Sequence, residues 1–383
     1  MEKIRLGDAC DILNGFAFKS DKYVEDGIRI IRIANVQKGY IEDNAPVFYP
    51  INSADLEKYM LEEDDLLMSL TGNVGRVALL QKEMVPAALN QRVACLRLKT
   101  GGIKKRFLFH ILNSDFFEQQ CVRAANGVAQ KNISTEWLKD YEIPLYSIGE
   151  QLKITDVLDK TRRIIASRRD ELNALDNLIK ARFVEMFGDP ILNPKGYKKE
   201  PAESHIDLLS GYPFKSEQYV DEGVNICGGL IIMPQNIKWE ECMHWNSTEG
   251  YEDYLLNEND IVIALDRPWI SNGFKIAKVD AEHLPALLIQ RTARVRAIDM
   301  NQEYLYYCFI NGRFESHSNV TGSLVPHISA KDIRSFEVML PPMELQNQFA
   351  DFVHQVDKSK VAVQKALEEA QVLFDSLMQQ YFG

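Results

Sequence analysis

The sequence predicts an α/β protein of the α+β type, with two similar mixed domains and two long helices that pair as an antiparallel coiled coil. Apolar residues recur in alternating steps of four and three from Ile154 to Met186, which is the period of a helix that packs against another helix. The same register recurs 195 positions later, from Phe349 to Tyr381. Each stretch ends in Phe-Gly, at Phe187-Gly188 and at Phe382-Gly383, and a glycine is a common helix stop. Two stripes in one register indicate that the two helices pair with each other.

The regions ahead of the two helices are also copies of each other. The turn Gly15–Gly27 recurs as Gly211–Gly223, with Gly, Phe, Lys, Ser, Tyr, Val and Gly matched. Gln91-Arg92 likewise recurs as Gln290-Arg291. A period this long indicates a duplicated domain rather than a solenoid. We therefore expect domains at residues 1–147 and 189–343, and long helices at 148–188 and 344–383.

Within each globular region the pattern alternates between strands and short helices. Runs rich in β-branched and apolar residues predict strands at Ile28–Ile33, Leu66–Leu70, Arg92–Leu98 and Ile261–Leu265. Helical patterns follow at Arg106–Leu112 and Glu303–Phe309, and a short segment at Thr135–Leu138 leads into a further strand. Prolines then break the chain before each long helix.

Composition excludes several classes of protein. No apolar run reaches membrane-spanning length, and the first residues lead into no signal-peptide core. The six cysteines are scattered, with no two at metal-ligand spacing, so we expect reduced thiols in a cytoplasmic protein. The net charge of −11 argues against a non-specific coat on DNA, although local basic clusters would still permit a DNA reader.

The sequence contains none of the usual catalytic motifs. It has no G-x-G-x-x-G, no phosphate-binding Gly-Lys-Ser/Thr loop and no H-E-x-x-H. Asp64-Asp65 is interpreted as a loop entry on a solvated face rather than as a pair of metal ligands. His327 lies near Ser329, but without an orienting acid the two do not make a triad. We therefore expect no catalytic residues, no metal site and no cofactor.

Two polar loops follow the buried strands and carry more information. Ser69–Arg76 combines two glycines with Asn73 and Arg76, and its counterpart is Asp266–Gly273. Glycines let backbone N–H groups approach a phosphate, and Asn or Arg side chains read base edges in the major groove. The alternative interpretation is a plain hairpin connection with a satisfied arginine.

Further polar residues precede strands or follow the repeated turn. The alternatives are a structural ion pair at the Gln-Arg positions, solvated lysines in the turns, and a packing role for the tryptophan. The candidate DNA contacts are Lys19, Ser20, Thr71, Asn73, Arg76, Asn90, Gln91, Arg92, Gln130 and Lys131 in the first domain, and Lys215, Ser216, Arg267, Trp269, Asn272, Gln290, Arg291, Ser323 and His327 in the second.

With these motifs in their order, the chain resembles the specificity subunit of a type I restriction–modification enzyme. The resemblance rests on the turn Gly15–Ser20, the loop Thr71–Arg76, the helix entries Gln151 and Gln346, and Phe187–Pro190, and it covers essentially the whole chain. It implies two target recognition domains that each read one half of a split site in double-stranded DNA. It also implies that the paired helices dock two methyltransferase subunits, through which endonuclease-motor subunits join. S-adenosylmethionine and ATP would then belong to those partners.

The expected helix length suits this interpretation. A helix of this size spans roughly 55 Å at 1.5 Å per residue, so domains at its two ends could meet half-sites about one turn of DNA apart. Two other classes remain open: a protein scaffold that reads no DNA, and an enzyme with unrecognised chemistry.

Overall fold

The structure is a computed structural model that describes residues 2–51, 56–99, 101–125, 132–312, 314–321 and 325–383. The chain divides into two compact units, Met1–Asp170 with Gln364–Gly383 (unit 1) and Glu171–Val363 (unit 2). Each unit contains one globular region and a part of both long helices, α5 (Ile148–Phe187) and α9 (Met343–Phe382). The unit boundaries lie within α5 and α9, because each unit groups the residues that pack together. The domain boundaries expected from sequence lie instead at the ends of the two helices.

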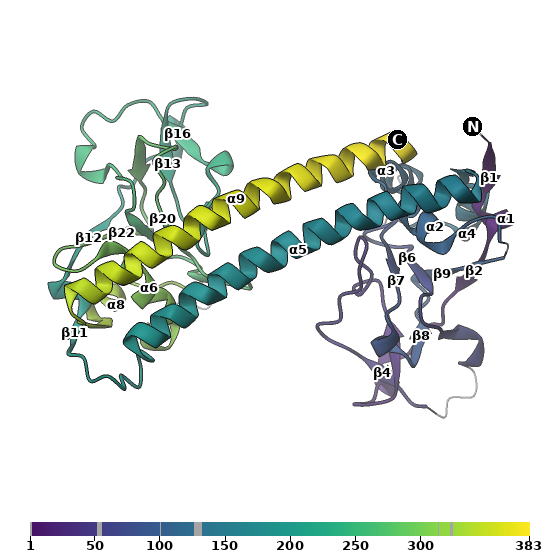
Figure 1. Cartoon of the computed structure of the whole chain (residues 1–383), viewed down its shortest axis with the longest axis horizontal. Helices are drawn as coiled ribbons and strands as arrows, with labels where there is room; N and C mark the ends of the chain where they lie inside the picture. Colours follow the sequence, from purple (N-terminus) through teal and green to yellow (C-terminus); the bar gives the residue numbers. More distant parts are fainter. Residues whose placement is uncertain (1, 52–55, 100, 126–131, 313, 322–324) are drawn as a thin grey trace. The chain divides into compact units, whose positions relative to one another are not determined.

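Unit 1 contains two small sheets and a strand pair (Figure 1). The first sheet is antiparallel, in the order β2 (Cys10–Asn14), β9 (Val93–Leu98), β6 (Leu66–Ser69), β7 (Val77–Leu79). The second has the order β4 (Phe48–Tyr49), β3 (Ile28–Ile31), β8 (Ala87–Leu89), β5 (Met60–Leu61), with β3 parallel to β8. Strand β1 (Lys3–Arg5) pairs with β10 (Glu142–Pro144). The short helices of this unit are α1 (Leu6–Ala9), α2 (Lys105–Leu112), α3 (Asp115–Ala124) and α4 (Thr135–Asp140).

Unit 2 repeats this topology. Its first sheet has the order β12 (Ile206–Ser210), β22 (Thr292–Ala297), β17 (Ile261–Ala264), β20 (Ile276–Lys278). Its second has β16 (Met243–Trp245), β13 (Val224–Cys227), β21 (Ala286–Leu288), again with one parallel pair, β13 and β21. Strand β11 (Lys199–Pro201) pairs with β23 (Glu337–Met339). Helices α6 (Gln302–Asn311), α7 (Phe314–His317) and α8 (Ala330–Ser335) complete the unit, with two hairpins, β14–β15 (Ile232–Met233, Asn236–Ile237) and β18–β19 (Trp269–Ile270, Gly273–Phe274).

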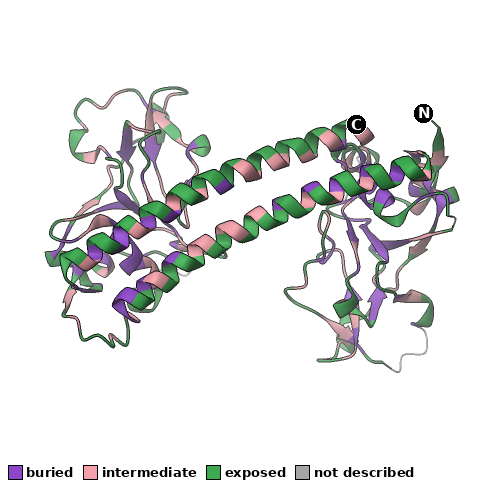
Figure 2. Cartoon of the chain, viewed as in Figure 1, coloured by how far each residue is buried: buried purple, intermediate pink, exposed green. Residues whose placement is uncertain are grey.

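The helix register predicted from sequence is confirmed within each unit. In unit 1 the α5 residues Ile154, Leu158 and Ile165 are buried, and in unit 2 the α9 residues Phe349, Val353 and Val356 are buried. Figure 2 shows buried positions along one side of each helix, with exposed positions between them. The polar members of the register are accommodated too. Thr161 is buried and donates to the backbone carbonyl of Val157, while Lys360 forms an ion pair with Asp176 at 2.5 Å. The Lys360–Asp176 ion pair thus joins α9 to α5 in unit 2, and in unit 1 the guanidinium of Arg162 on α5 lies 5.6 Å from the ring centroid of Phe374 on α9.

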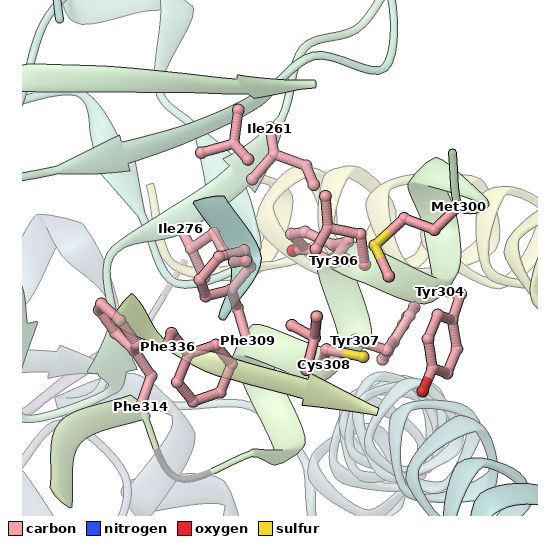
Figure 3. Close-up of a cluster of buried hydrophobic side chains, with 14 of the residues drawn as sticks. Ile261, Ile276, Met300, Tyr304, Tyr306, Tyr307, Cys308, Phe309, Phe314 and Phe336 are labelled. Atoms are coloured by element: carbon pink, nitrogen blue, oxygen red, sulfur yellow. The ribbon is translucent and has the colours of Figure 1, made fainter. Parts of the chain in front are cut away.

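The long helices also complete the core of each globular region. In unit 1 Phe382 of α9 packs edge-on against Phe107 of α2, with ring centroids 5.6 Å apart. In unit 2 the ring centroid of Phe187 on α5 lies 4.7 Å from that of Tyr304 on α6. Both rings belong to a cluster rich in aromatic side chains, part of which is drawn in Figure 3. Burying one such ring contributes about 1.5–3 kcal/mol. Each Phe-Gly terminus is thus part of a domain core as well as a helix stop.

Local interactions explain where α5 begins and ends. Ser147 and Glu150 form a reciprocal capping box, with the Ser147 N–H donating to Glu150 at 3.0 Å and the Glu150 N–H donating to Ser147 Oγ at 3.3 Å. At the other end Gly188 has a φ of +82°, the left-handed conformation that favours glycine. Lys195 Nζ donates to the carbonyl of Met186 at 2.7 Å, which places a cation at the negative end of the helix dipole.

Helix α3 and both hairpins of unit 2 were not predicted from sequence. The solvated position expected for Asp64-Asp65 is wrong for Asp65, which is buried and forms an ion pair with Arg97 at 2.6 Å, whereas the adjacent Asp64 is exposed. Among the described residues, no helix combines the length and the apolar character needed to cross a bilayer. The same residues contain no cluster of His, Cys, Asp or Glu suited to a metal ion.

Candidate nucleic-acid interface

Three backbone hydrogen bonds bring the polar loops of unit 1 together. The N–H of Leu70 donates to the carbonyl of Arg92 at 3.0 Å, and the N–H of Ile133 donates to that of Leu70 at 2.9 Å. The N–H of Gln91 donates to the carbonyl of Phe16 at 3.0 Å. The repeated turn, the loop after β6, the start of β9 and the segment before α4 therefore meet at one place, which we call polar edge 1.

Unit 2 makes the same three hydrogen bonds at equivalent positions. Leu265 donates to Arg291 at 2.9 Å, Ile328 donates to Leu265 at 2.9 Å, and Gln290 donates to Tyr212 at 2.8 Å. We call this arrangement polar edge 2. Duplication has preserved the scaffold that gathers these loops, while the side chains on it differ.

Close backbone packing explains the glycine that opens each repeated turn. A Cβ on Gly15 would lie 2.2 Å from the carbonyl of Asn90, and one on Gly211 would lie 1.9 Å from that of Ile289. Both distances are far inside van der Waals contact, so only glycine lets the turn lie against the strand end. This packing is what holds the turn beside the Gln-Arg pair in each unit.

Most candidate residues of polar edge 1 are solvent-exposed. Asn73, Gln91 and Arg92 are exposed, Asn90 is half-buried, and the described residues provide no ion-pair partner for Arg92. Thr71 is buried instead, and its hydroxyl lies 3.3 Å from the Asn132 side-chain oxygen. Lys19 and Ser20 are exposed just beyond the turn, whereas Gln130 and Lys131 lie outside the described residues.

Polar edge 2 carries a different set of side chains. Exposed candidates there are Lys215, Ser216, Arg267, Asn272, Gln290, Arg291 and His327, while Ser323 lies outside the described residues. Trp269 is half-buried and stacks on Phe274, with ring centroids 5.2 Å apart and planes 19° from parallel. Its ring thus packs on a neighbouring ring, and the DNA contact expected for Trp269 stays a prediction.

The two edges differ in charge. Arg291 forms an ion pair with Asp266 at 2.5 Å, although its side chain remains 70% exposed. The residue that corresponds to Asp266 in unit 1 is the neutral Thr71, which occupies the same place after the buried strand. Arg92 on polar edge 1 therefore has no carboxylate partner among the residues that the structure describes, whereas Arg291 on polar edge 2 is partly neutralised by Asp266.

Gln37 and Lys275 lie at the edges and were not predicted from sequence. Arg76 donates a hydrogen bond to the side-chain oxygen of Gln37, which lies in a stretch without a recognisable motif. Lys275 is buried just before β20, where it donates to the carbonyl of Gly229. The loop between β17 and β20 is longer than the loop between β6 and β7, so their residues do not align by number. The sequence therefore indicated Arg267, and not Lys275, as the basic residue of the second loop.

Comparison with known proteins decides the family. The model for the type I restriction modification DNA specificity domain matches residues 1–177 and 212–371. The chain belongs to this family. The specificity subunit of the type I restriction enzyme EcoAI from Escherichia coli is 31% identical over 201 residues, covering 49% of this chain and 33% of the relative. The putative MjaX specificity subunit from Methanocaldococcus jannaschii is 22% identical over 93% of this chain and 88% of the relative.

Several of the relatives are matched only in part, since the chain spans 33% to 42% of the length of three of them. Two solved structures extend over the whole chain. The type I restriction–modification S subunit from M. genitalium superposes with a TM-score of 0.56 at 16% identity, covering all of this chain and 96% of the other. A structure from a study of assembly and conformational transition in a type I system gives a TM-score of 0.54 at 16% identity, covering 97% of that chain. The fold of this type I specificity-domain protein is therefore the one that the sequence predicted.

Proposed function

We propose that this type I specificity-domain protein reads double-stranded DNA through polar edges 1 and 2, one half of a split site with each. The observation that carries the proposal is the repeated set of three backbone hydrogen bonds, which presents a different group of side chains on each unit. A shared scaffold with variable polar side chains is what two readers of different base sequences require. Because the two edges differ, the site is asymmetric.

The chemistry of polar edge 1 favours DNA over a peptide. Arg92, Gln91 and Asn73 are exposed amide and guanidinium groups, the side chains that make bidentate contacts with guanine and adenine. Lys19 and Ser20 lie just beyond the turn and are suited to phosphate contacts, which fix orientation without reading sequence. The net charge of the chain is −11, so most of its surface repels DNA. Binding therefore depends on where these few basic and polar groups lie.

We further propose that the long helices dock two methyltransferase subunits, through which endonuclease-motor subunits join. Val157, Ile164 and Leu178 are 38%, 50% and 48% exposed on α5 and lie at multiples of seven residues, which is a second apolar stripe beside the one that packs on α9. The chain itself then contributes no catalytic residue. S-adenosylmethionine and ATP bind to the partners, and the complex acts in the cytoplasm, where the six free cysteines stay reduced.

Selection of bound duplexes from a randomised library tests this function. The full chain is incubated with the library together with its methyltransferase partner, and bound DNA is sequenced. We expect two short conserved blocks separated by a fixed stretch without conservation. Enrichment of no sequence at all would favour the scaffold class instead, and one contiguous block would exclude a two-edge reader.

A matched pair of variants connects the result to polar edge 1. Gln91 and Arg92 are replaced together by alanine, and the control replaces the exposed Lys82 and Glu83, which lie on the turn before β8. The first variant should lose the conservation of one block only. The control should leave both blocks unchanged.

A further inference from the structure

Arg76 and Lys275 occupy equivalent positions in the two units, although their numbers do not correspond. In unit 1 Met68 pairs with Val77 across β6 and β7, and in unit 2 Ile263 pairs with Ile276 across β17 and β20. Arg76 and Lys275 each precede the second of these strands by one residue. The backbone agrees, since the N–H of Ser69 donates to the carbonyl of Arg76 at 2.9 Å and that of Ala264 donates to Lys275 at 3.1 Å.

Each of these strands also holds a hairpin that follows the strand β3 or β13 in the chain. We call residues 33–41 hairpin A and residues 229–237 hairpin B. The N–H of Gly39 donates to the carbonyl of Val77 at 2.8 Å, and the N–H of Gln235 donates to that of Ile276 at 2.8 Å. Gly39 and Gln235 share a positive φ, +88° and +59°, so the two hairpins turn in the same way.

The two cations bind these same hairpins. Arg76 Nη1 donates to Gln37 Oε1, and Gln37 Nε2 in turn donates to the carbonyl of Ala34 at 2.9 Å. In unit 2 Lys275 Nζ donates directly to the carbonyl of Gly229. In unit 1 Arg76 is therefore linked to the hairpin backbone through the side chain of Gln37. In unit 2 Lys275 binds the hairpin backbone directly.

Neither acceptor is a carboxylate, which separates this pair of residues from ordinary ion pairs. Lys275 is only 6% exposed, and burial together with the nearby charge of Arg267 lowers its pKa. Asp266 acts on this ammonium only through its charge, so the hydrogen bond to the hairpin carbonyl is the direct contact that compensates for burial of Lys275. Arg76 is half-buried with its guanidinium on a neutral amide.

We propose that Arg76 and Lys275 are positioning residues, which anchor the downstream end of the loop on each polar edge to hairpin A or hairpin B and do not touch DNA. The proposal rests on the function given above, because it assigns the loops a role in reading DNA. It revises the direct contact expected for Arg76 from its position in the Ser69–Arg76 loop. It also adds Lys275, which no motif indicated.

Hydrogen–deuterium exchange on the full chain without DNA tests the anchor itself. Arg76→Leu should raise exchange of the amides in hairpin A, including that of Gly39, by about fivefold, which corresponds to the loss of about 1 kcal/mol for one hydrogen bond. Lys275→Met should do the same in hairpin B. Arg76→Lys and Lys275→Arg, which exchange the cations that the two units use, should restore most of the protection. Unchanged exchange in the Leu and Met variants would overturn the proposal.

Gln37→Met provides a second route in case Arg76→Leu folds poorly. It removes the acceptor from the hairpin and leaves Arg76 in place, so it should raise exchange in hairpin A as well. Arg92→Ala, on the same edge but without a contact to the hairpin, should leave the exchange of hairpin A unchanged. A large effect of Arg92→Ala would indicate general loosening and would contradict a specific anchor.

The salt dependence of DNA binding separates positioning from contact. A residue that neutralises a phosphate contributes about one unit to the slope of log K against log salt concentration. Arg76→Leu should weaken binding while leaving that slope unchanged, whereas a fall of about one unit would show that Arg76 contacts DNA. If the chain and its partner bind no duplex, the proposed function fails, while the exchange result still decides the anchor.

Discussion

The side-chain oxygen of Gln151 accepts a hydrogen bond from the backbone N–H of Lys104 at 2.9 Å, and Gln346 does the same for Asn301 at 2.9 Å. The amide group of Gln151 also donates to the carbonyls of Gly102 and Tyr146, at 2.9 and 2.8 Å. Both glutamines lie in the first turn of a long helix and are buried. Each one therefore joins the start of its helix to the loop before α2 or α6 of the same unit.

Gln151→Leu should lower the free energy of unfolding by about 2–4 kcal/mol. The leucine would remove three hydrogen bonds to part-buried backbone groups, at about 0.5–1.5 kcal/mol net for each. Urea denaturation measures the loss. The control is Gln348→Leu, an exposed position on α9, which should change stability by less than about 0.5 kcal/mol. Equal stability of the two variants would contradict the structural role of Gln151.

Arg92→Ala should weaken binding of the cognate duplex by about 1–3 kcal/mol, the range for one base-reading contact. Competition binding with duplexes mutated in one half at a time measures the effect. We expect the loss only when the half read by unit 1 is intact. The same loss on every duplex would instead identify Arg92 as a phosphate contact, and no loss would remove it from the interface.

Asp266→Asn should strengthen binding to all duplexes at low salt. The substitution removes a negative charge from polar edge 2 and frees the 70% exposed Arg291 from its ion pair at 2.5 Å. The gain should diminish as salt rises, because exposed charges are screened within about 10 Å at 0.1 M. Fluorescence anisotropy on a random duplex checks this. Weaker binding of Asp266→Asn would mean that the ion pair is needed to orient Arg291.

His205 should make the stability of unit 2 depend on pH. Its ring nitrogens lie 2.8 Å from Asp299 and 2.9 Å from Glu200. Burial alone would lower its pKa, but the two carboxylates outweigh burial and raise the pKa above the ordinary value. A raised pKa in the folded state stabilises the protein fully below about pH 6.5, the unfolded value, and this contribution is lost as pH rises through the folded pKa.

His205→Gln tests this sign. The wild-type protein should have the higher free energy of unfolding, and its advantage over the variant should be larger at pH 5.5 than at pH 9. Urea denaturation followed by tryptophan fluorescence reports mainly on unit 2, which contains three of the four tryptophans, Trp239, Trp245 and Trp269, whereas Trp137 lies in unit 1. A difference that grows toward high pH would contradict a protonated His205.

The fold was predictable because its signals are periodic and occur twice. The heptad positions on α5 and α9 depend only on which residues are apolar, so every predicted position is buried or half-buried. Motifs that are weak by themselves also recur in the other half of the chain, which supports their assignment. Asp65 was misjudged for the opposite reason, since its partner Arg97 lies 32 residues away on another strand.

The candidate site was predictable as a set of loops but not as a set of contacts. Three segments lie close together in each unit: the repeated turn, the Gln-Arg pair and the loop after the buried strand. They do so because the strand ends that carry them meet at one place. The Arg76–Gln37 and Lys275–Gly229 hydrogen bonds depend on hairpins A and B, whose position beside the loops sequence spacing does not give. Trp269 shows the same limit, because only packing reveals that its ring lies on Phe274.

Modified-base mapping in cells tests the central claim most directly. Genomic DNA is sequenced for methylated adenine from cells that carry this chain with its methyltransferase partner, and from cells in which the chain is deleted. The account predicts methylated adenines within one asymmetric motif of two blocks with a fixed spacer, present only with the chain, and relaxed in one block by Arg92→Ala. Methylation that persists without the chain, or that marks one contiguous motif, would contradict it.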